Sequence, residues 1–202
     1  MQFFNLINTR AQKIVLRREQ RVFFFWNESR HIEFSFEKPG TTARIFALFI
    51  GNDTDAFTLS VIQNHKKSDT SSFLTVLSIL DGHARLSYDG LIRIEEGAVR
   101  TDTAQTNRNL LLSEHSRAST SPRLEILADD VSARHASATG TTNLDARFTL
   151  ETRGIERISA ERLLAEGTLR NFFDEMRTYT RDPEVDALEK EALEKLSIHP
   201  HI

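Results

Sequence analysis

Apolar and polar positions alternate with a period of two along most of the first 150 residues. The run 31–37 places Ile32, Phe34 and Phe36 on one face and its polar side chains on the other. The run 57–61 repeats this alternation. Alternation over such lengths is typical of β-strands that bury one face. The pattern therefore predicts a mainly β region with many short strands between about residues 12 and 150.

Turn-forming residues separate these runs, at Gly51-Asn52-Asp53, Asp81-Gly82 and Asp89-Gly90. Local rules interpret the Asp-Gly pairs as hairpin turns and predict an antiparallel sandwich. A parallel β-helix is the alternative, because its stacked coils also contain many short strands with polar corners. The sequence shows no clean repeat of fixed length, so periodicity alone leaves both architectures open.

The periodicity changes to that of helices after Ile155. Ser159 is a candidate cap for a first short helix that ends near Gly167. A second helix is predicted to carry Phe172 and Phe173 on one apolar face. The C-terminal part of the chain is therefore expected to be helical.

A third helix is predicted to start at Asp182-Pro183-Glu184, which combines a capping carboxylate, a proline and an acidic residue near the positive end of the dipole. Its apolar stripe is formed by Val185, Leu188, Ala192, Leu193 and Leu196. Such a stripe packs on a core or binds a partner, and core packing is the more common outcome. Phe23-Phe24-Phe25-Trp26 is apolar on both faces, which predicts a place in a core or an interface.

The length, net charge and cysteine content of the chain exclude several classes of function. The chain has 202 residues, a formal net charge of -3 and no cysteine. The length favours one domain, or one domain with a helical appendage. The charge argues against a general nucleic-acid binder, which would have a strong basic excess. Without cysteine there is no disulfide, zinc–thiolate site or cysteine nucleophile.

The sequence contains neither a targeting signal nor a common nucleotide-binding motif. No stretch has the form of a signal peptide or the length of a membrane span, so we expect a soluble, cytoplasmic protein without membrane contact. The motifs GxxxxGK[ST], GxGxxG and GxSxG do not occur. Any ATP chemistry is therefore expected to belong to a partner.

Three sequence blocks follow one another in the order of a known family. Residues 100–113 read RTDTAQTNRNLLLS, residues 122–131 read PRLEILADDV, and residues 152–155 read TRGI. Together they resemble the SufB/SufD family, the scaffold proteins of SUF iron–sulfur cluster assembly, over about residues 57–167. In the stacked coils of such a protein, Asn107 and Asn109 would form an Asn-rich corner that hydrogen-bonds up and down the stack.

The resemblance implies a mainly β fold, a right-handed parallel β-helix with a C-terminal α-helical extension, and so favours the β-helix over the hairpin interpretation. We expect the β-helix core in residues 1–155, with residues 1–30 as an abbreviated N-terminal segment, and the helical region in residues 156–202. The implied function is a non-enzymatic scaffold or accessory subunit that dimerises with itself or with a SufB-type paralogue. A SufC-type ATPase would dock on the helices, with candidate contacts at Arg153, Gly154, Ile155, Leu163, Leu164, Phe172 and Phe173.

One histidine remains of the family's K-C-S-H-G-A-T signature. Ala133 stands at the position of the cysteine, Arg134 at that of the serine, and His135 is the retained histidine. The resemblance thus implies a short, cysteine-free, SufD-like member with His135 as a candidate ligand at a subunit interface. Because iron–sulfur clusters favour thiolate ligands, we expect no cluster bound stably by this chain alone, and a transient cluster only within a complex.

Two alternative functions stay open. One is a β-helical interaction module that has lost cluster chemistry. The other is a carbohydrate-active β-helix enzyme, in which Asp129 would share a pocket with Glu125 or Asp145. His65 lies in a polar run typical of a solvated loop. The tail pair His199 and His201 has a spacing that could bind a stray metal ion, but a flexible chain end is the favoured interpretation.

Overall fold

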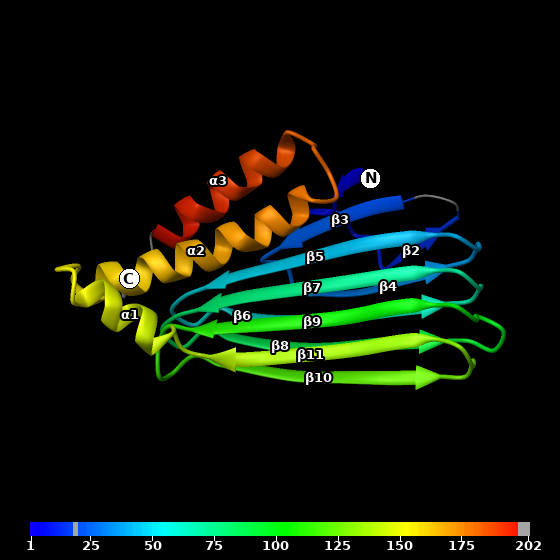
Figure 1. Ribbon diagram of the computed structural model, residues 1–202, viewed down its shortest axis with the longest axis horizontal. Coiled ribbons are helices and arrows are strands. Elements are labelled where there is room, and N and C mark those ends of the chain that lie inside the picture. The colour runs from blue at the N-terminus through cyan, green and yellow to red at the C-terminus, as the bar shows by residue number, and fades with distance from the viewer. Residues whose placement is uncertain (18–19, 198–202) are drawn as a thin grey trace.

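The computed structural model describes residues 1–17 and 20–197 and shows a β-solenoid with helices against one of its sheets (Figure 1). All paired strands are parallel and belong to two sheets. The six-stranded sheet contains, in order, β1 (Gln2–Asn5), β3 (Gln20–Trp26), β5 (Thr42–Gly51), β7 (Ser71–Leu80), β9 (Asp102–Leu111) and β11 (Ser132–Gly140). The five-stranded sheet contains β10 (Arg117–Ile126), β8 (Arg85–Ile94), β6 (Ala56–His65), β4 (Arg30–Phe36) and β2 (Lys13–Leu16). This arrangement confirms the mainly β, parallel β-helix prediction.

Successive strands alternate between the two sheets, so each coil uses one strand from each. In the six-stranded sheet Thr42 pairs with Ser71, Ser71 with Asp102, and Asp102 with Ser132. Asp81-Gly82 forms a corner between β7 and β8, whereas Asp89-Gly90 lies within β8. The hairpin interpretation of these pairs is therefore wrong, because each strand pairs with the next coil and not with its neighbour in sequence.

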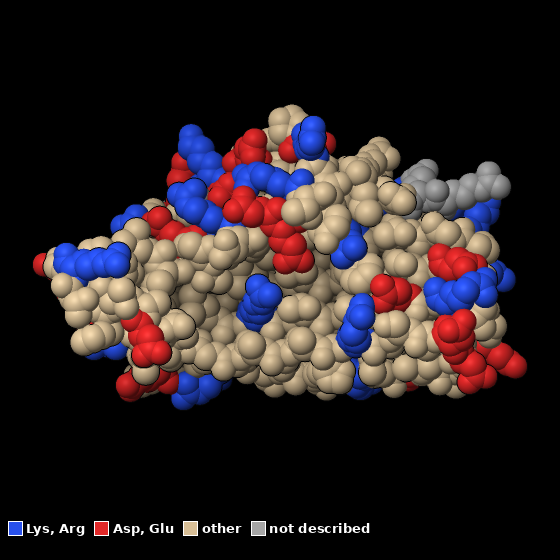
Figure 2. Space-filling view, viewed as in Figure 1, with Lys and Arg blue, Asp and Glu red and all other residues tan. Residues whose placement is uncertain are grey.

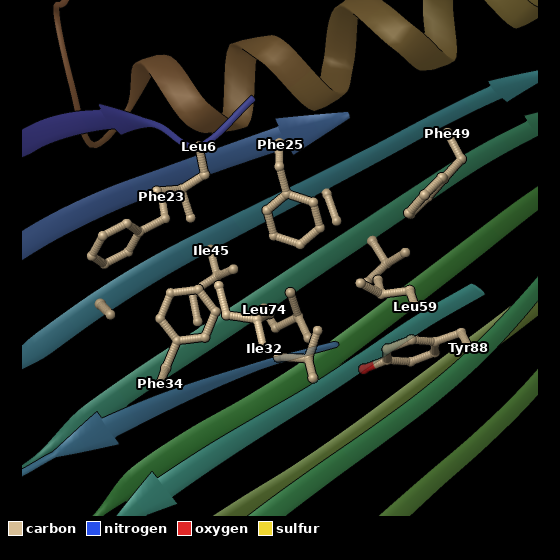
Figure 3. Close-up of a cluster of buried hydrophobic side chains, with 14 of the residues drawn as sticks. Leu6, Phe23, Phe25, Ile32, Phe34, Ile45, Phe49, Leu59, Leu74 and Tyr88 are labelled. Carbon is tan, nitrogen blue, oxygen red and sulfur yellow. The ribbon is translucent and has the colours of Figure 1, made fainter. Parts of the chain in front are cut away.

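The first hydrophobic core fills the space between the two sheets (Figure 3). Phe23 and Phe25 of β3 face Phe34 of β4 there, and the rings of Phe23 and Phe34 lie 5.2 Å apart. The second core lies between the outer face of the six-stranded sheet and the helices. Phe24 belongs to this second core, with its ring 5.9 Å from that of Phe173. Because successive side chains of a strand point to opposite faces, the apolar run 23–26 places apolar side chains on both faces of β3, as the sequence predicts.

The helical region begins earlier than expected, with α1 (Leu144–Glu151). The Asn143 side chain accepts a hydrogen bond from the Ala146 amide and so caps this helix. The next helix, α2, is continuous over Arg157–Arg177. The predicted break at Gly167 and the cap at Ser159 are therefore wrong, because packing of the apolar face on the sheet maintains the helix through one glycine.

The last helix, α3 (Glu184–Ser197), begins as the sequence predicts, because the Asp182 carboxylate accepts a hydrogen bond of 3.0 Å from the Glu184 amide. Its apolar stripe packs in the second core, which confirms the core interpretation of that stripe. Arg177 of α2 forms ion pairs with Asp186, at 2.8 Å, and with Glu189. None of the described helices has the length and apolarity that crossing a bilayer requires.

Candidate interaction edge and helical surface

The last coil leaves one end of the solenoid open. Among the residues that the structure describes, β11 pairs only with β9, and β10 pairs only with β8. The Ser132 amide donates to the Thr101 carbonyl of the neighbouring coil at 2.8 Å. Since backbone groups of successive strand residues point to opposite sides, the amides and carbonyls of the odd-numbered β11 residues point to the open edge. These residues are Ala133, His135, Ser137 and Thr139.

The same four residues turn their side chains toward the solenoid interior. The Asn109 amide, inside the preceding coil, donates to the Thr139 hydroxyl at 2.9 Å. Across the two sheets, the hydroxyls of Ser137 and Thr120 lie 3.2 Å apart. His135 is in register with Gln105, which is 2% exposed. The imidazole is therefore placed at the mouth of the open end, where it is exposed.

Strand β10, the other strand of the last coil, is a poorer template than β11 for pairing with another chain. Arg117 and Leu127 donate their amides to the β8 side, so the even-numbered positions of β10 face the open edge. Pro122 occupies one of them and has no amide to offer. Leu124 and Ile126, on the same edge, are 38% and 42% exposed. The open end thus combines one unbroken strand edge, β11, with an interrupted one that carries exposed apolar side chains.

Beneath the open end, the interior changes from apolar to polar. Asn109 accepts a hydrogen bond from Ser78 at 2.7 Å and donates to Asn107 at 2.6 Å. Together with the bond to Thr139, these contacts confirm that asparagines hydrogen-bond along the stack, although they lie inside β9 and not at a corner. Within the described ranges, the buried side chains of Gln105 and Tyr88 have polar atoms without a hydrogen-bond partner.

His65 has a different place from the one expected. It lies in β6, is fully buried, and stacks on the Phe36 ring at 4.3 Å. Its Nδ1 is 2.7 Å from the Thr70 hydroxyl and its Nε2 is 2.8 Å from the Ser72 hydroxyl. Burial lowers the pKa of His65 to about 3. The solvated-loop interpretation is wrong, because polar partners from the same and the next coil satisfy this neutral imidazole inside the solenoid.

The helical candidate residues separate into exposed and buried groups. Arg153 and Gly154 are exposed between α1 and α2, Ile155 and Leu164 are half-buried, and Leu163 is 48% exposed. Phe172 and Phe173, in contrast, are 4% and 0% exposed and pack against Phe24 of β3. While α2 lies on the sheet, these two phenylalanines hold the helix in place and offer no surface to a partner.

Sequence reasoning missed three exposed apolar side chains beside this group. Leu144, Phe148 and Ile158 are 60%, 65% and 59% exposed. The spacing of Leu144 and Phe148, one helical turn apart, was a usable signal, but the segment was expected in the β region. Arg147 of α1 pairs with Glu161 of α2 at 2.9 Å and so fixes the two helices together. The exposed apolar residues Leu144, Phe148, Ile158 and Leu163 are named the helical surface below.

Charged groups also lie beside the helical surface, where Arg147 pairs with Glu151 and Arg157 pairs with Glu161. Figure 2 shows them gathered over α2 and α3 and at the coil corners, with a largely uncharged sheet face between. Of the carboxylates considered for glycoside hydrolysis, Glu125 pairs with Arg93 at 2.7 Å. Asp145 lies on α1, at the opposite end of the coils from the segment between β10 and β11 that contains Asp129 (Figure 1). The described residues contain no group of three His, Asp or Glu side chains placed to hold a metal ion.

The structure is a parallel solenoid with a helical extension and, at its last coil, an unpaired strand edge. Residues 27–168 match the family model for the SUF system FeS cluster assembly, SufBD core domain. The chain therefore belongs to the SufB/SufD family.

Curated relatives agree with this assignment. The chain is 34% identical over 158 residues to an iron–sulfur cluster assembly SufBD family protein of Mycobacterium leprae, which covers 74% of this chain and 39% of that protein. It is 33% identical over 100 residues to SufD of Escherichia coli, an alignment that covers 50% of this chain and 24% of that protein. It is 32% identical over 126 residues to SufD of Bacillus subtilis, where the alignment covers 62% of this chain and 28% of that protein. The chain thus spans about two-fifths or less of the length of these relatives.

Proposed function

We propose that this chain is a non-enzymatic scaffold or accessory subunit of SUF-type iron–sulfur cluster assembly. The observation that carries the proposal is the open end of a SufBD core, where an unpaired strand edge and His135 lie together. Relatives named as iron–sulfur cluster assembly proteins support the process. The site offers edges and exposed apolar residues, which suit contact with other subunits.

Dimerisation would use the β11 edge. An unpaired strand edge is a ready template for pairing with another chain, and main-chain hydrogen bonds then provide affinity. Leu124 and Ile126 would be covered by the same contact, which removes exposed apolar surface from water. The partner is a second copy of this chain or a SufB-type paralogue.

His135 would face the partner from the centre of this edge. A neutral imidazole offers a nitrogen to iron, but one nitrogen is far short of a cluster's ligand set. The chain has no cysteine, so thiolates would come from the partner. A cluster would therefore be held transiently, as cargo, between the two chains.

The helical surface would dock a SufC-type ATPase. Leu144, Phe148, Ile158 and Leu163 extend over α1 and the start of α2, next to Arg153 and Gly154. Leu144 and Phe148 lie one helical turn apart on α1, and exposed apolar residues that lie together mark protein contacts more often than isolated ones.

A proline substitution in β11 tests whether dimerisation uses the β11 edge. Ser137→Pro removes one amide that points to the open edge and leaves the β9 bonds in place, as Pro122 does in β10. We expect the variant to stay folded and to lose the dimer, as measured by light scattering with the candidate partner. Ser121→Ala, on β10, is the control and should dimerise normally. A Ser137→Pro chain that still dimerises would exclude the β11 edge.

A carboxylate on α2 tests the docking surface. Leu163→Asp should abolish co-purification with a SufC-type ATPase, because docking would bury a charge. Asn171→Asp places the same group at another exposed position of α2 and should bind as the unmodified chain does. Equal binding by both variants would contradict docking at the helical surface.

The interaction-module alternative makes a different prediction for His135. Anaerobic reconstitution with iron and sulfide, together with a cysteine-bearing partner, should give cluster absorbance that falls with His135→Asn if His135 is a ligand. Absorbance that is unchanged in a dimer that still forms would favour a module without cluster chemistry.

A further inference from the structure

Two histidines from successive coils stack on each other at one corner of the solenoid. The rings of His83 and His115 lie 4.8 Å apart, with planes inclined by only 6°. Both follow the same local design: the Ala84 amide donates to the Asp81 carbonyl, and the Ser116 amide donates to the Ser113 carbonyl. The following strands start in register, so the stack of coils itself brings the two imidazoles together.

The ring nitrogens of this pair are free. Both side chains are exposed, and within the described part of the chain neither ring makes a hydrogen bond. His31 and His65 differ, since His31 bonds to Ser60 and His65 bonds to two hydroxyls. The backbone beneath the pair is well anchored: the His83 amide donates to the Asp53 carbonyl at 2.7 Å, and the His115 amide donates to the Ser113 hydroxyl at 3.1 Å.

Two unoccupied imidazoles on anchored corners suit a divalent transition metal ion. Imidazole nitrogen is a preferred ligand of zinc, copper, nickel and iron ions, at about 2.0–2.1 Å for zinc. Two nitrogens bound to one ion lie closer together than the 4.8 Å that separates the ring centres of His83 and His115. Rotation of the exposed side chains about their own torsions would turn the rings from parallel to convergent, without moving the coils.

We propose that His83 and His115 form a two-histidine surface site for a divalent transition metal ion. No third His, Asp or Glu side chain of the described residues completes a ligand set, so water would fill the other positions. Such an ion would bind exchangeably. The pair lies at the corners between β7 and β8 and between β9 and β10, and the proposal does not depend on the proposed function.

Calorimetric titration with nickel(II) tests the site. The starting chain carries His199→Asn and His201→Asn, because the spacing of the tail histidines could bind the ion independently. Since a two-point contact gains roughly 100-fold over a single one, His83→Asn and His115→Asn should each weaken binding by about that factor. His31→Asn is the matched control at another exposed histidine and should leave the affinity unchanged.

Paramagnetic line broadening in NMR spectra locates the ion. Nickel should broaden the His83 and His115 ring signals first and equally. Binding that survives His83→Asn, or that depends on His135 instead, would overturn the proposal. An absence of saturable binding in the starting chain would overturn it as well.

Discussion

The phenol of Tyr88 occupies the space that a side chain on Gly90 would need. A β-carbon on Gly90 would lie 2.2 Å from the Tyr88 hydroxyl oxygen and 2.5 Å from Oε1 of Gln105. Both neighbours are buried in the solenoid. Glycine inside β8 is therefore a packing requirement of the interior and not a turn signal.

Gly90→Ala should lower the free energy of unfolding by about 1–3 kcal/mol, the usual cost of overpacking a core. Urea denaturation followed by circular dichroism measures this change. Gly140→Ala is the control, because a β-carbon there meets nothing within 4 Å. It should change stability by less than about 0.5 kcal/mol. Equal effects at the two positions would contradict the packing account.

Two glycines of the helical region should respond to alanine with opposite signs. Gly167 lies inside α2 with open space around it, so Gly167→Ala should stabilise the chain by about 0.5–1 kcal/mol. Gly154 has a φ of +85°, which alanine adopts poorly. Gly154→Ala should therefore destabilise the chain, and thermal unfolding of both variants compares the signs directly.

Phe173 should behave as a core residue. Phe173→Ala should cost about 3–5 kcal/mol, because it removes a fully buried ring from the contact between α2 and the six-stranded sheet. Leu163→Ala, on the exposed side of the same helix, should cost far less. Denaturant unfolding of both variants tests the assignment. If Phe173→Ala lowered the free energy of unfolding only slightly, Phe173 would again be a candidate docking residue.

His65 should make stability depend on pH. Its pKa is lowered from 6.5 to about 3 in the folded chain, so between these values the unfolded chain binds a proton that the folded chain does not. Stability should therefore fall as the pH drops below about 6.5, by about 1.4 kcal/mol per pH unit from this group.

The variant His65→Gln isolates this contribution. Glutamine keeps polar atoms near Thr70 and Ser72 but does not titrate, so the difference in unfolding free energy between the two chains should shrink as the pH falls from 7.5 to 5. A constant difference over that range would show that His65 is not the group responsible.

Sequence patterns established the strand-rich region, the helical C-terminus and the family blocks. The unbroken apolar run 23–26 correctly indicated two apolar faces, and Asp182-Pro183-Glu184 correctly marked the start of α3. Both signals are local, since they depend on the direction of neighbouring side chains and on the capping of a single helix turn.

Only the tertiary structure decided which residues meet. A period of two does not say whether a strand pairs with its neighbour in sequence or with a strand one coil away, so Asp89-Gly90 looked like a turn and His65 looked solvated. Phe36 of β4 and Ser72 of β7 contact His65 of β6, and Gln105 of β9 limits the space around Gly90 together with Tyr88 of the same strand. The same holds for the burial of Phe172 and Phe173 and for the stacking of His83 on His115, because contacts between distant segments exist only once the coils have stacked.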